Sequence, residues 1–219
     1  MVSVISFDLN GTLVDRYYAD YFWLELIPQI YAEEHGVSFE EAYSYVISEY
    51  DRIGPDNINW YLPEYWIRHF HLNVSLEELI ERTLSKVMIY PEVPEVLREL
   101  GRDFILVISS NTSIEFIDAI LEKIYAEVGY RVFSRVFSCV TDMYLPRKEV
   151  RFYEYVYRSL QVPPHSILHV GDDLKYDYEI PRSVGMRAYL VDRRGELDPS
   201  LQVALIRNLK ELPKLLSTI

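Results

Sequence analysis

The feature that most constrains the fold is a set of short, continuous apolar runs rich in β-branched and aromatic residues. They are unbroken instead of alternating, which is typical of strands buried on both faces of a parallel sheet. The runs are Val2–Phe7, Phe104–Ser109, Val136–Val140, Ile167–Val170 and Ala188–Val191. Parallel strands need crossover connections, and long helical stretches between the runs supply them. The sequence therefore predicts a three-layer α/β/α Rossmann-like core.

The longest connection, between the first two runs, has no strand pattern. Helical segments are expected near 16–34, 38–50, 60–71 and 75–88. Two of these helices begin with a capping box, in which a serine is followed three residues later by a glutamate that can accept a hydrogen bond from the serine N–H. The pairs are Ser38 with Glu41 and Ser75 with Glu78. This stretch is expected to be an inserted all-helical domain.

The boundaries of this insertion follow from its flanks. The insert is expected to cover 16–88, with the core formed by 1–15 and 89–219. Inside it, the segment DRIGPDN (Asp51–Asn57) combines Gly, Pro, Asp and Asn, which predicts a loop. Arg52 in that loop is a candidate for selecting the substrate.

Size and charge exclude several classes of protein. A chain of 219 residues with 49% hydrophobic content can bury one good core and a small second lobe. Its net charge of −12 argues against a nucleic-acid partner, which would need a basic patch. No run approaches the roughly 20 apolar residues of a membrane span. The single cysteine, Cys139, suits a reducing compartment, so we expect a cytoplasmic protein whose oligomeric state stays open.

Small polar clusters follow the predicted strands. They are Asp8, Asn10 and Thr12 after the first, Ser110, Asn111 and Thr112 after the second, Arg147 and Lys148 after the third, and Asp172, Asp173 and Asp177 after the fourth. Each cluster alone could be a turn or a helix cap. Because ligands bind at the carboxyl ends of parallel strands, we expect the clusters to form one site. Three close acids would repel each other without a cation.

In chain order, these segments resemble the motifs of the haloacid dehalogenase superfamily, in particular members with a helical cap inserted after the first motif. The segments are FDLNGTLVD, ISSNTS, the region around Lys148, and HVGDDLKYD. The resemblance covers essentially the whole chain. It implies a hydrolase in which Asp8 attacks phosphorus and forms an aspartyl-phosphate that water then hydrolyses.

The resemblance also implies a Mg²⁺ cofactor, because a carboxylate that attacks a phosphate dianion needs a cation between them. The implied metal ligands are Asp8, the backbone carbonyl of Asn10, and Asp172, with Asp177 behind them. Ser110 would donate a hydrogen bond to a phosphoryl oxygen. Leu9 and Asn111, through their backbone N–H groups, and Thr112 would also bind the substrate.

The third motif of the family usually places its lysine six residues before a phenylalanine. Counting back from Phe152 gives Pro146, and the adjacent basic residues are Arg147 and Lys148. We favour Lys148 as the residue that neutralises the nucleophile, with Arg147 as the alternative.

Asn10 departs from the family pattern, in which an aspartate protonates the leaving oxygen and later deprotonates water. Asn10 can do neither, and losing this catalysis lowers rates roughly 10²–10⁴-fold. The sequence therefore predicts a reduced phosphatase that favours good leaving groups. Three explanations of the missing acid stay open. Asn10 could replace a natural aspartate, or it could deamidate to aspartate because it precedes Gly11. Alternatively, Asp15 or Asp20 could serve as the acid.

Two other functions compete with a phosphatase acting on a small phosphorylated metabolite. A 2-haloacid dehalogenase would use Asp8 against carbon and needs no acid at Asn10, but GDDLKYD fits it poorly because dehalogenases work without a metal. A non-catalytic module that binds a phospho-ligand or a protein partner is the third reading.

Several other side chains have more than one reading. Residues at the start of the insert could touch substrate, namely Arg16, Tyr17, Tyr18 and Asp20. A group of aromatic residues could line a pocket, although packing inside the helical bundle is favoured: Trp60, Tyr61, Tyr65 and Trp66. The histidines show no metal-ligand spacing and are expected to be structural: His35, His69, His71, His165 and His169.

Overall fold

The computed structural model describes residues 1–198 and 200–217. Within these residues a six-stranded parallel sheet has the order β3-β2-β1-β4-β5-β6. The strands are β1 (Val4–Phe7), β2 (Ile105–Ser110), β3 (Phe133–Ser138), β4 (Ile167–Gly171), β5 (Arg187–Val191) and β6 (Leu205–Ile206). The predicted α/β class is confirmed.

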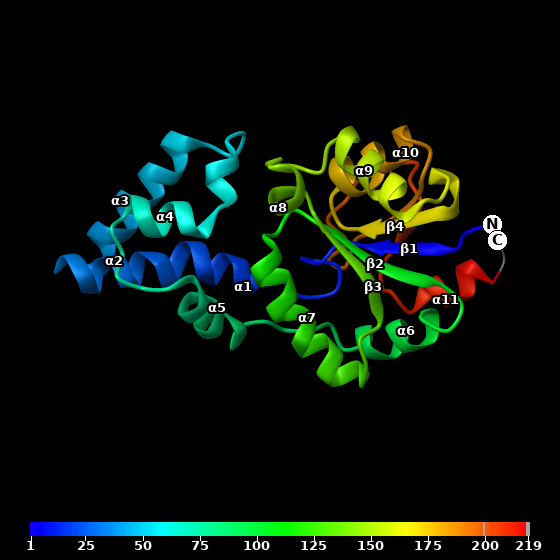
Figure 1. Ribbon diagram of the computed structural model, residues 1–219, viewed down its shortest axis with the longest axis horizontal. Coiled ribbons are helices and arrows are strands. Elements are labelled where there is room, and N and C mark those ends of the chain that lie inside the picture. The colour runs from blue at the N-terminus through cyan, green and yellow to red at the C-terminus, as the bar shows by residue number, and fades with distance from the viewer. Residues whose placement is uncertain (199, 218–219) are drawn as a thin grey trace.

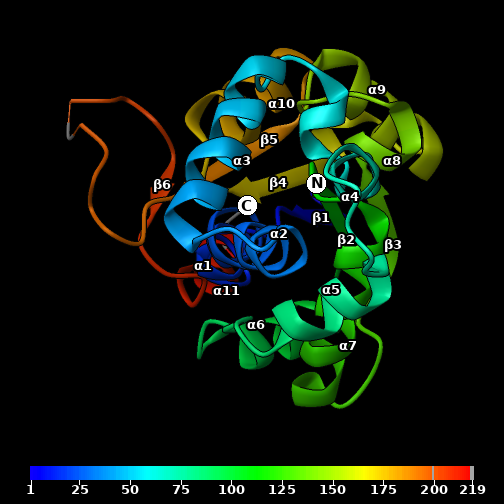
Figure 2. The ribbon, with the colours of Figure 1, turned by 90° about the vertical axis from the view of Figure 1, so that its left-hand side faces the viewer.

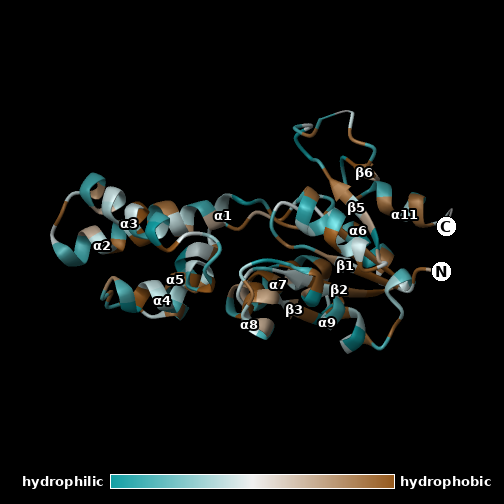
Figure 3. Ribbon diagram, turned by 90° about the horizontal axis from the view of Figure 1, so that it is seen from above, coloured by the Kyte–Doolittle hydropathy of each residue, from teal (hydrophilic) through white to brown (hydrophobic). Residues whose placement is uncertain are grey.

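Helices cover both faces of the sheet (Figure 1). One face is covered by α6 (Val93–Leu100), α7 (Ile114–Val128) and α11 (Glu211–Leu216), and the other by α9 (Val150–Leu160) and α10 (Ile180–Ser183). All four residues of β1 are buried, as its unbroken apolar run predicts. Figure 3 shows the central strands in brown, whereas the helices carry both hydrophobic and hydrophilic residues.

The order of the strands brings the functional segments together. Strand β1 pairs with β2 on one side and with β4 on the other, so the chain reverses its direction across the sheet between them. The carboxyl ends of β1, β2 and β4 lead to Asp8, Ser110 and Asp172, respectively. In open α/β sheets such a switch point forms a crevice in which ligands bind.

Two strand predictions need correction. The third strand was expected at Val136–Val140, but β3 ends at Ser138 and residues Cys139–Met143 form helix α8. The Ser138 hydroxyl caps this helix by accepting a hydrogen bond from the Thr141 N–H at 3.0 Å. An apolar run alone does not distinguish a strand from the first turn of a buried helix. Strand β6 was not predicted, since two residues carry no periodic pattern.

The helices from α1 to α5 and the loops between them, which lie between β1 and α6 in the chain, form a separate lobe at the carboxyl ends of the strands (Figures 1 and 2). We call residues 16–88, which hold α1 to α5, the insert. Its elements are α1 (Tyr17–Asp20), a π-helix (Tyr21–Leu26), α2 (Ile27–His35), α3 (Phe39–Ile53), a 3₁₀-helix (Ile58–Tyr61), α4 (Pro63–His69) and α5 (Leu76–Leu84). None of the described helices has the length and apolarity needed to cross a membrane.

The two linkers of the insert lie against each other. The Asp15 N–H donates to the Met88 carbonyl at 2.9 Å, and the Tyr90 N–H donates to the Leu13 carbonyl at 3.1 Å. Val14 and Ile89 form an antiparallel bridge between them. The chain therefore leaves and re-enters the core at one place.

Both serines cap their helices, but of the two predicted capping boxes only the first is reciprocal. Ser38 and Glu41 make the reciprocal capping box, and the Ser75 hydroxyl accepts from the Glu78 N–H at 3.1 Å. The predicted loop Asp51–Asn57 is partly wrong, because its first three residues complete the last turn of α3. That helix continues while its buried face extends to Tyr50, and it ends at Gly54, where φ is +75°.

Candidate active site

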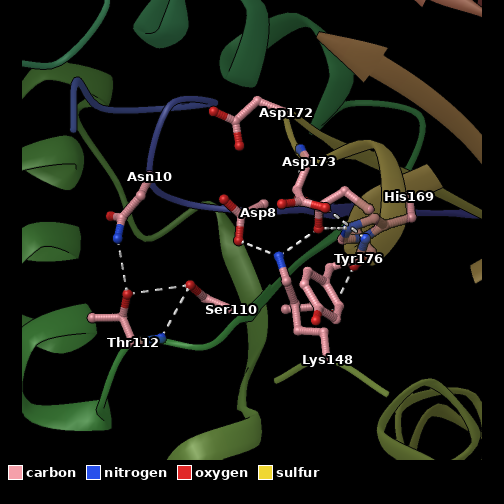
Figure 4. Close-up of polar contacts among 12 residues, drawn as sticks. Asp8, Asn10, Ser110, Thr112, Lys148, His169, Asp172, Asp173 and Tyr176 are labelled. Atoms are coloured by element: carbon pink, nitrogen blue, oxygen red, sulfur yellow. Dashed lines mark hydrogen bonds and ion pairs between the residues drawn. The ribbon is translucent and has the colours of Figure 1, made fainter. Parts of the chain in front are cut away.

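A buried ammonium group joins two carboxylates at the carboxyl edge of the sheet (Figure 4). Lys148 Nζ donates a hydrogen bond to Asp8 Oδ1 at 2.6 Å and another to Asp177 Oδ1. Asp8 follows β1, Asp177 lies in the turn of π-helix after β4, and Lys148 lies just before α9. All three side chains are almost fully buried.

The electrostatics of this trio set its charges. Burial opposes the charge of Lys148, but Asp177 and Asp8 hold its pKa well above its usual range. Burial likewise opposes the charge of Asp177, but Lys148 and His169 hold its pKa well below its usual range. Burial raises the pKa of Asp8 against the opposing effect of Lys148. Lys148 and Asp177 therefore stay charged, while a further cation would favour the ionised form of Asp8.

Asp177 is fixed by a second group of contacts. His169 Nε2 lies 2.9 Å from Asp177 Oδ1, and the Asp173 N–H donates to Asp177 Oδ2 at 3.1 Å. The Tyr153 hydroxyl lies 3.2 Å from His169 Nε2 and donates to the Tyr176 carbonyl at 2.6 Å. Sequence reasoning left His169 as a structural residue and missed Tyr153. A histidine inside an otherwise apolar strand was the one signal available.

Asp172 completes a carboxylate cluster. Oxygen atoms of Asp8, Asp172 and Asp177 lie within 4.8 Å of one another. Burial and the neighbouring Asp8 raise the pKa of Asp172 to about 7. Carboxylate oxygens grouped this closely suit Mg²⁺, and a divalent ion would relieve the repulsion between the three carboxylates. The residues therefore fit the metal that the resemblance implies. Arg16 from the insert lies against the cluster, with its Nη2 atom 2.6 Å from Asp172 Oδ2.

Two glycines allow the carboxylates to approach the backbone. A Cβ atom at Gly11 would lie 1.7 Å from Asp172 Oδ2, and one at Gly171 would lie 2.3 Å from Asp177 Cγ. Gly11 also has φ +77°, a conformation that disfavours side chains. Both positions require glycine for the cluster to form as it does.

Asn10 is held between the core and the insert. Its Nδ2 donates to Thr112 Oγ1 at 3.2 Å, and its Oδ1 accepts a hydrogen bond from the Tyr18 hydroxyl. Burial holds the pKa of Tyr18 well above its usual range, so this hydroxyl stays a donor. An amide suits the position because it donates on one side and accepts on the other.

Of the remaining predicted site residues, some lie at the pocket beside Asp8 and others do not. Ser110 is fully buried, with its hydroxyl 3.4 Å from Thr112 Oγ1, and Leu9 is buried in the core. Arg147 points toward the insert instead of the carboxylates, and donates to Asp56 Oδ1 at 3.4 Å. The structure thus brings Lys148, not Arg147, to Asp8.

Arg52 lies elsewhere. It is in the last turn of α3, where its Nη2 atom pairs with Glu49 Oε2 at 2.7 Å and its side chain is 57% exposed. The reason is the extra helical turn, which places this residue on the helix surface instead of in a loop. We therefore propose no substrate contact for Arg52.

A pocket of about 260 Å³ opens over the carboxylates and draws on both the core and the insert. Its lining residues are Asp8, Asn10, Arg16, Ala19, Asp20, Asn111, Arg147, Lys148, Asp172, Asp173, Tyr176 and Asp177. Of the two acids considered in place of Asn10, Asp20 lies at this pocket. The Asp15 carboxylate instead accepts from the Tyr17 N–H at 2.8 Å and the Tyr90 hydroxyl at 3.4 Å.

Arg193 is a further residue that sequence reasoning missed. Its guanidinium donates to the carbonyls of Thr12 at 2.7 Å and Gly11 at 3.3 Å, and pairs with Glu92 at 2.6 Å. It also lies 3.6 Å from the centre of the Tyr90 ring. These contacts hold the loop that follows Asp8 and connect it to the returning linker. Nothing local in the sequence marks a partner so far along the chain.

Comparisons with known proteins show which family the chain belongs to. The family model of the haloacid dehalogenase-like hydrolases matches residues 2–185. The GMP/IMP nucleotidase YrfG of Escherichia coli (strain K12) is 28% identical over 112 residues, which are 50% of this chain and 50% of that protein. The chain thus aligns with about half the length of this curated relative.

Solved structures match over nearly the whole chain. A HAD phosphatase from Thermococcus onnurineus has a TM-score of 0.81 and 26% identity, with 99% of this chain and 98% of that chain covered. A HAD family enzyme from Bacteroides thetaiotaomicron, in complex with magnesium and inorganic phosphate, shares the fold at a TM-score of 0.64 and 14% identity, covering 91% and 98%. The chain belongs to the haloacid dehalogenase-like hydrolase family.

Proposed function

We propose that the protein is a Mg²⁺-dependent phosphomonoester hydrolase that acts on a small phosphorylated metabolite. The observation that carries this proposal is the buried contact of Lys148 with both Asp8 and Asp177, beside a third carboxylate, Asp172. Arg16 and Arg147 add positive charge to the same pocket. A phosphate dianion would find cations there that offset its charge.

In the proposed reaction, an Asp8 carboxylate oxygen attacks phosphorus and the bond to the leaving oxygen breaks. Water then attacks the aspartyl-phosphate, which releases inorganic phosphate and restores the carboxylate. Lys148 neutralises Asp8 and the developing charge. Mg²⁺, held by Asp8, the Asn10 carbonyl and Asp172 with Asp177 behind them, would supply the charge that lets two anions approach.

The phosphoryl group would be held by the loop after β2 and the loop after β1. The hydroxyl groups of Ser110 and Thr112 contact each other at 3.4 Å. A bound phosphoryl oxygen would accept hydrogen bonds from these hydroxyl groups in place of that contact. Asn111 lines the pocket, and the backbone N–H groups of Leu9 and Asn111 are further donors. These assignments together form the proposed substrate site.

Asn10 makes the proposed enzyme selective. Because the amide cannot protonate a leaving oxygen, substrates with good leaving groups should react best at the first step. Hydrolysis of the phosphoenzyme should be slow, because no base at Asn10 activates water. Asp20 is the acid whose position in the pocket best suits a substitute.

We further propose that the insert, residues 16–88, acts as a cap over the core formed by 1–15 and 89–219. The Arg147 contact with Asp56 joins the two across the pocket, and the paired linkers give the insert one point of attachment. Closure of such a lobe would exclude water from the substrate. The buried, free thiol of Cys139 is consistent with a cytoplasmic protein.

The carboxylate cluster favours the phosphatase over the haloacid dehalogenase, whose reaction needs no metal. A non-catalytic phospho-ligand module would bind a phosphate ester without hydrolysing it.

The test is Mg²⁺-dependent phosphate release from p-nitrophenyl phosphate by the protein, by Asn10→Asp and by Asp8→Asn. We expect a gain of about 10²-fold or more for Asn10→Asp and no activity for Asp8→Asn. Equal inactivity of all three proteins would reject the proposal.

A further inference from the structure

We propose that the substrate carries a planar aromatic ring on its leaving group, and that this ring binds in an aromatic pocket between the insert and the core. This inference rests on the proposed phosphatase function and adds a substrate class to it. Four residues define the pocket for this argument, Phe22, Trp23, Trp60 and Phe116, which we call the ring pocket.

The ring pocket has a volume of about 250 Å³. The Phe22 ring meets Phe116 edge-on with centroids 4.9 Å apart, and the Trp23 and Trp60 rings lie nearly parallel at 6.5 Å. Aromatic faces and edges of this kind attract another planar ring. The wall thus combines the insert, which provides three of these side chains, with Phe116 of core helix α7.

The ring pocket adjoins the phosphate site. Asn10, Ala19, Asp20 and Asn111 line both cavities. A phosphate ester bound at Asp8 would therefore extend its leaving group past Asn10 and Asn111 into the aromatic wall. Asp20 and Asn111 at this junction offer an acceptor and an amide for hydroxyl or N–H groups between the phosphate and the ring.

The aromatic side chains of the insert fall into two groups. Some pack in the interior of the bundle, and others line the ring pocket. Trp66 is 0% exposed and stacks on Phe70 inside the bundle. Trp60 and Tyr61 instead remain partly exposed and line the pocket. Sequence reasoning grouped these residues together and favoured a core role for all of them. The structure assigns that role to Trp66, while Trp60 faces the cavity next to the site.

The first test compares two ligands that have the same leaving oxygen. Inosine 5′-monophosphate and ribose 5-phosphate both leave a primary alcohol, and only the nucleotide has a planar aromatic ring. We expect kcat/KM to be at least about tenfold higher for the nucleotide, because stacking of a base on aromatic side chains is favourable by that order. Equal kcat/KM values would overturn the proposal.

Binding is measured separately from turnover. Asp8→Asn cannot form the phosphoenzyme, so tryptophan emission can be titrated at equilibrium. The protein has three tryptophans, and two of them, Trp23 and Trp60, line the ring pocket. Inosine 5′-monophosphate should quench this emission and bind at least about tenfold more tightly than ribose 5-phosphate. If turnover is absent but this preference holds, the phosphatase proposal fails and the ring pocket stands. If the preference is absent, the ring pocket fails.

Two variants test whether the preference for the nucleotide arises in the ring pocket. Trp60→Leu should reduce the nucleotide preference about tenfold. Tyr43→Leu is the matched control, because Tyr43 is an exposed aromatic residue of the insert on α3, and it should leave the preference unchanged. Thermal unfolding of both variants shows whether each is folded. A folded Trp60→Leu protein that keeps the full preference would place the ring elsewhere and contradict the proposal.

Discussion

The hydroxyl of Tyr18, on the first helix of the insert, donates a hydrogen bond to the amide oxygen of Asn10 in the core. Tyr18 is 2% exposed, so this donor is held away from bulk water. The contact therefore connects Asn10 with the lobe that lines one side of the pocket.

Tyr18→Phe should destabilise the protein by about 0.5–1.5 kcal/mol, because the hydrogen bond to the half-buried Asn10 oxygen is lost. Urea unfolding measures this change. Tyr17→Phe is the control on the same helix, and since Tyr17 is 41% exposed its effect should stay within about 0.5 kcal/mol. A loss as large for Tyr17→Phe as for Tyr18→Phe would show that the contact with Asn10 is not responsible.

Gly11→Ala should weaken Mg²⁺ binding at least about tenfold, because its Cβ would displace the Asp172 carboxylate. Isothermal titration with Mg²⁺ measures the affinity. Gly36→Ala is a matched control, since Gly36 also has positive φ, +68°, but no atom lies within 4 Å of its added Cβ. It should lower stability through backbone strain and leave Mg²⁺ affinity intact. The account is wrong about Asp172 if the two variants bind Mg²⁺ equally well.

Arg16→Met should tighten Mg²⁺ binding about two- to fivefold in the absence of substrate. The Arg16 guanidinium lies 2.6 Å from Asp172 and opposes a cation there, but its side chain is 55% exposed and the effect is screened. The same titration tests it. Arg68→Met, which removes an exposed pair with Glu64, serves as the control for the loss of one positive charge. An unchanged or weaker affinity for Arg16→Met would contradict the prediction.

Mg²⁺ affinity should increase as pH rises through about 7. Burial and Asp8 raise the pKa of Asp172 to about 7, so below that pH a proton occupies the carboxylate and must leave before the metal binds. Each unit of pH below this value should weaken binding by up to about tenfold, and the dependence should level off above it. Titrations on both sides of that pH measure the slope. A flat profile would mean that Asp172 is already ionised or does not bind the metal.

Much of the site was predictable because parallel strands share one carboxyl edge. Asp8, Ser110 and Asp172 each follow a buried run, and the strand order β2-β1-β4 places them side by side. The two capped helix starts at Ser38 and Ser75 were equally local signals.

Features that depend on distant contacts were not predictable from local pattern. The choice between Arg147 and Lys148 depends on how the chain turns before α9, where Tyr144 has φ +53°, and spacing along the sequence does not carry that information. Arg193 reaches the Gly11 and Thr12 carbonyls from the far end of the chain. Arg52 was misplaced for a local reason, because α3 continues past the predicted end at residue 50 and reaches Ile53, next to Gly54.

The central claim is that Asp8 becomes phosphorylated. The most direct measurement is peptide mass mapping after reaction with acetyl phosphate and Mg²⁺, followed by an acid quench. Acetyl phosphate has a good leaving group, and Asn10 should slow the hydrolysis that follows, so the phosphoenzyme should accumulate. We expect one added phosphoryl group on the peptide that contains Asp8, absent in Asp8→Asn and shorter-lived in Asn10→Asp. A phosphoryl group on another peptide, or none in a preparation that releases phosphate, would contradict it.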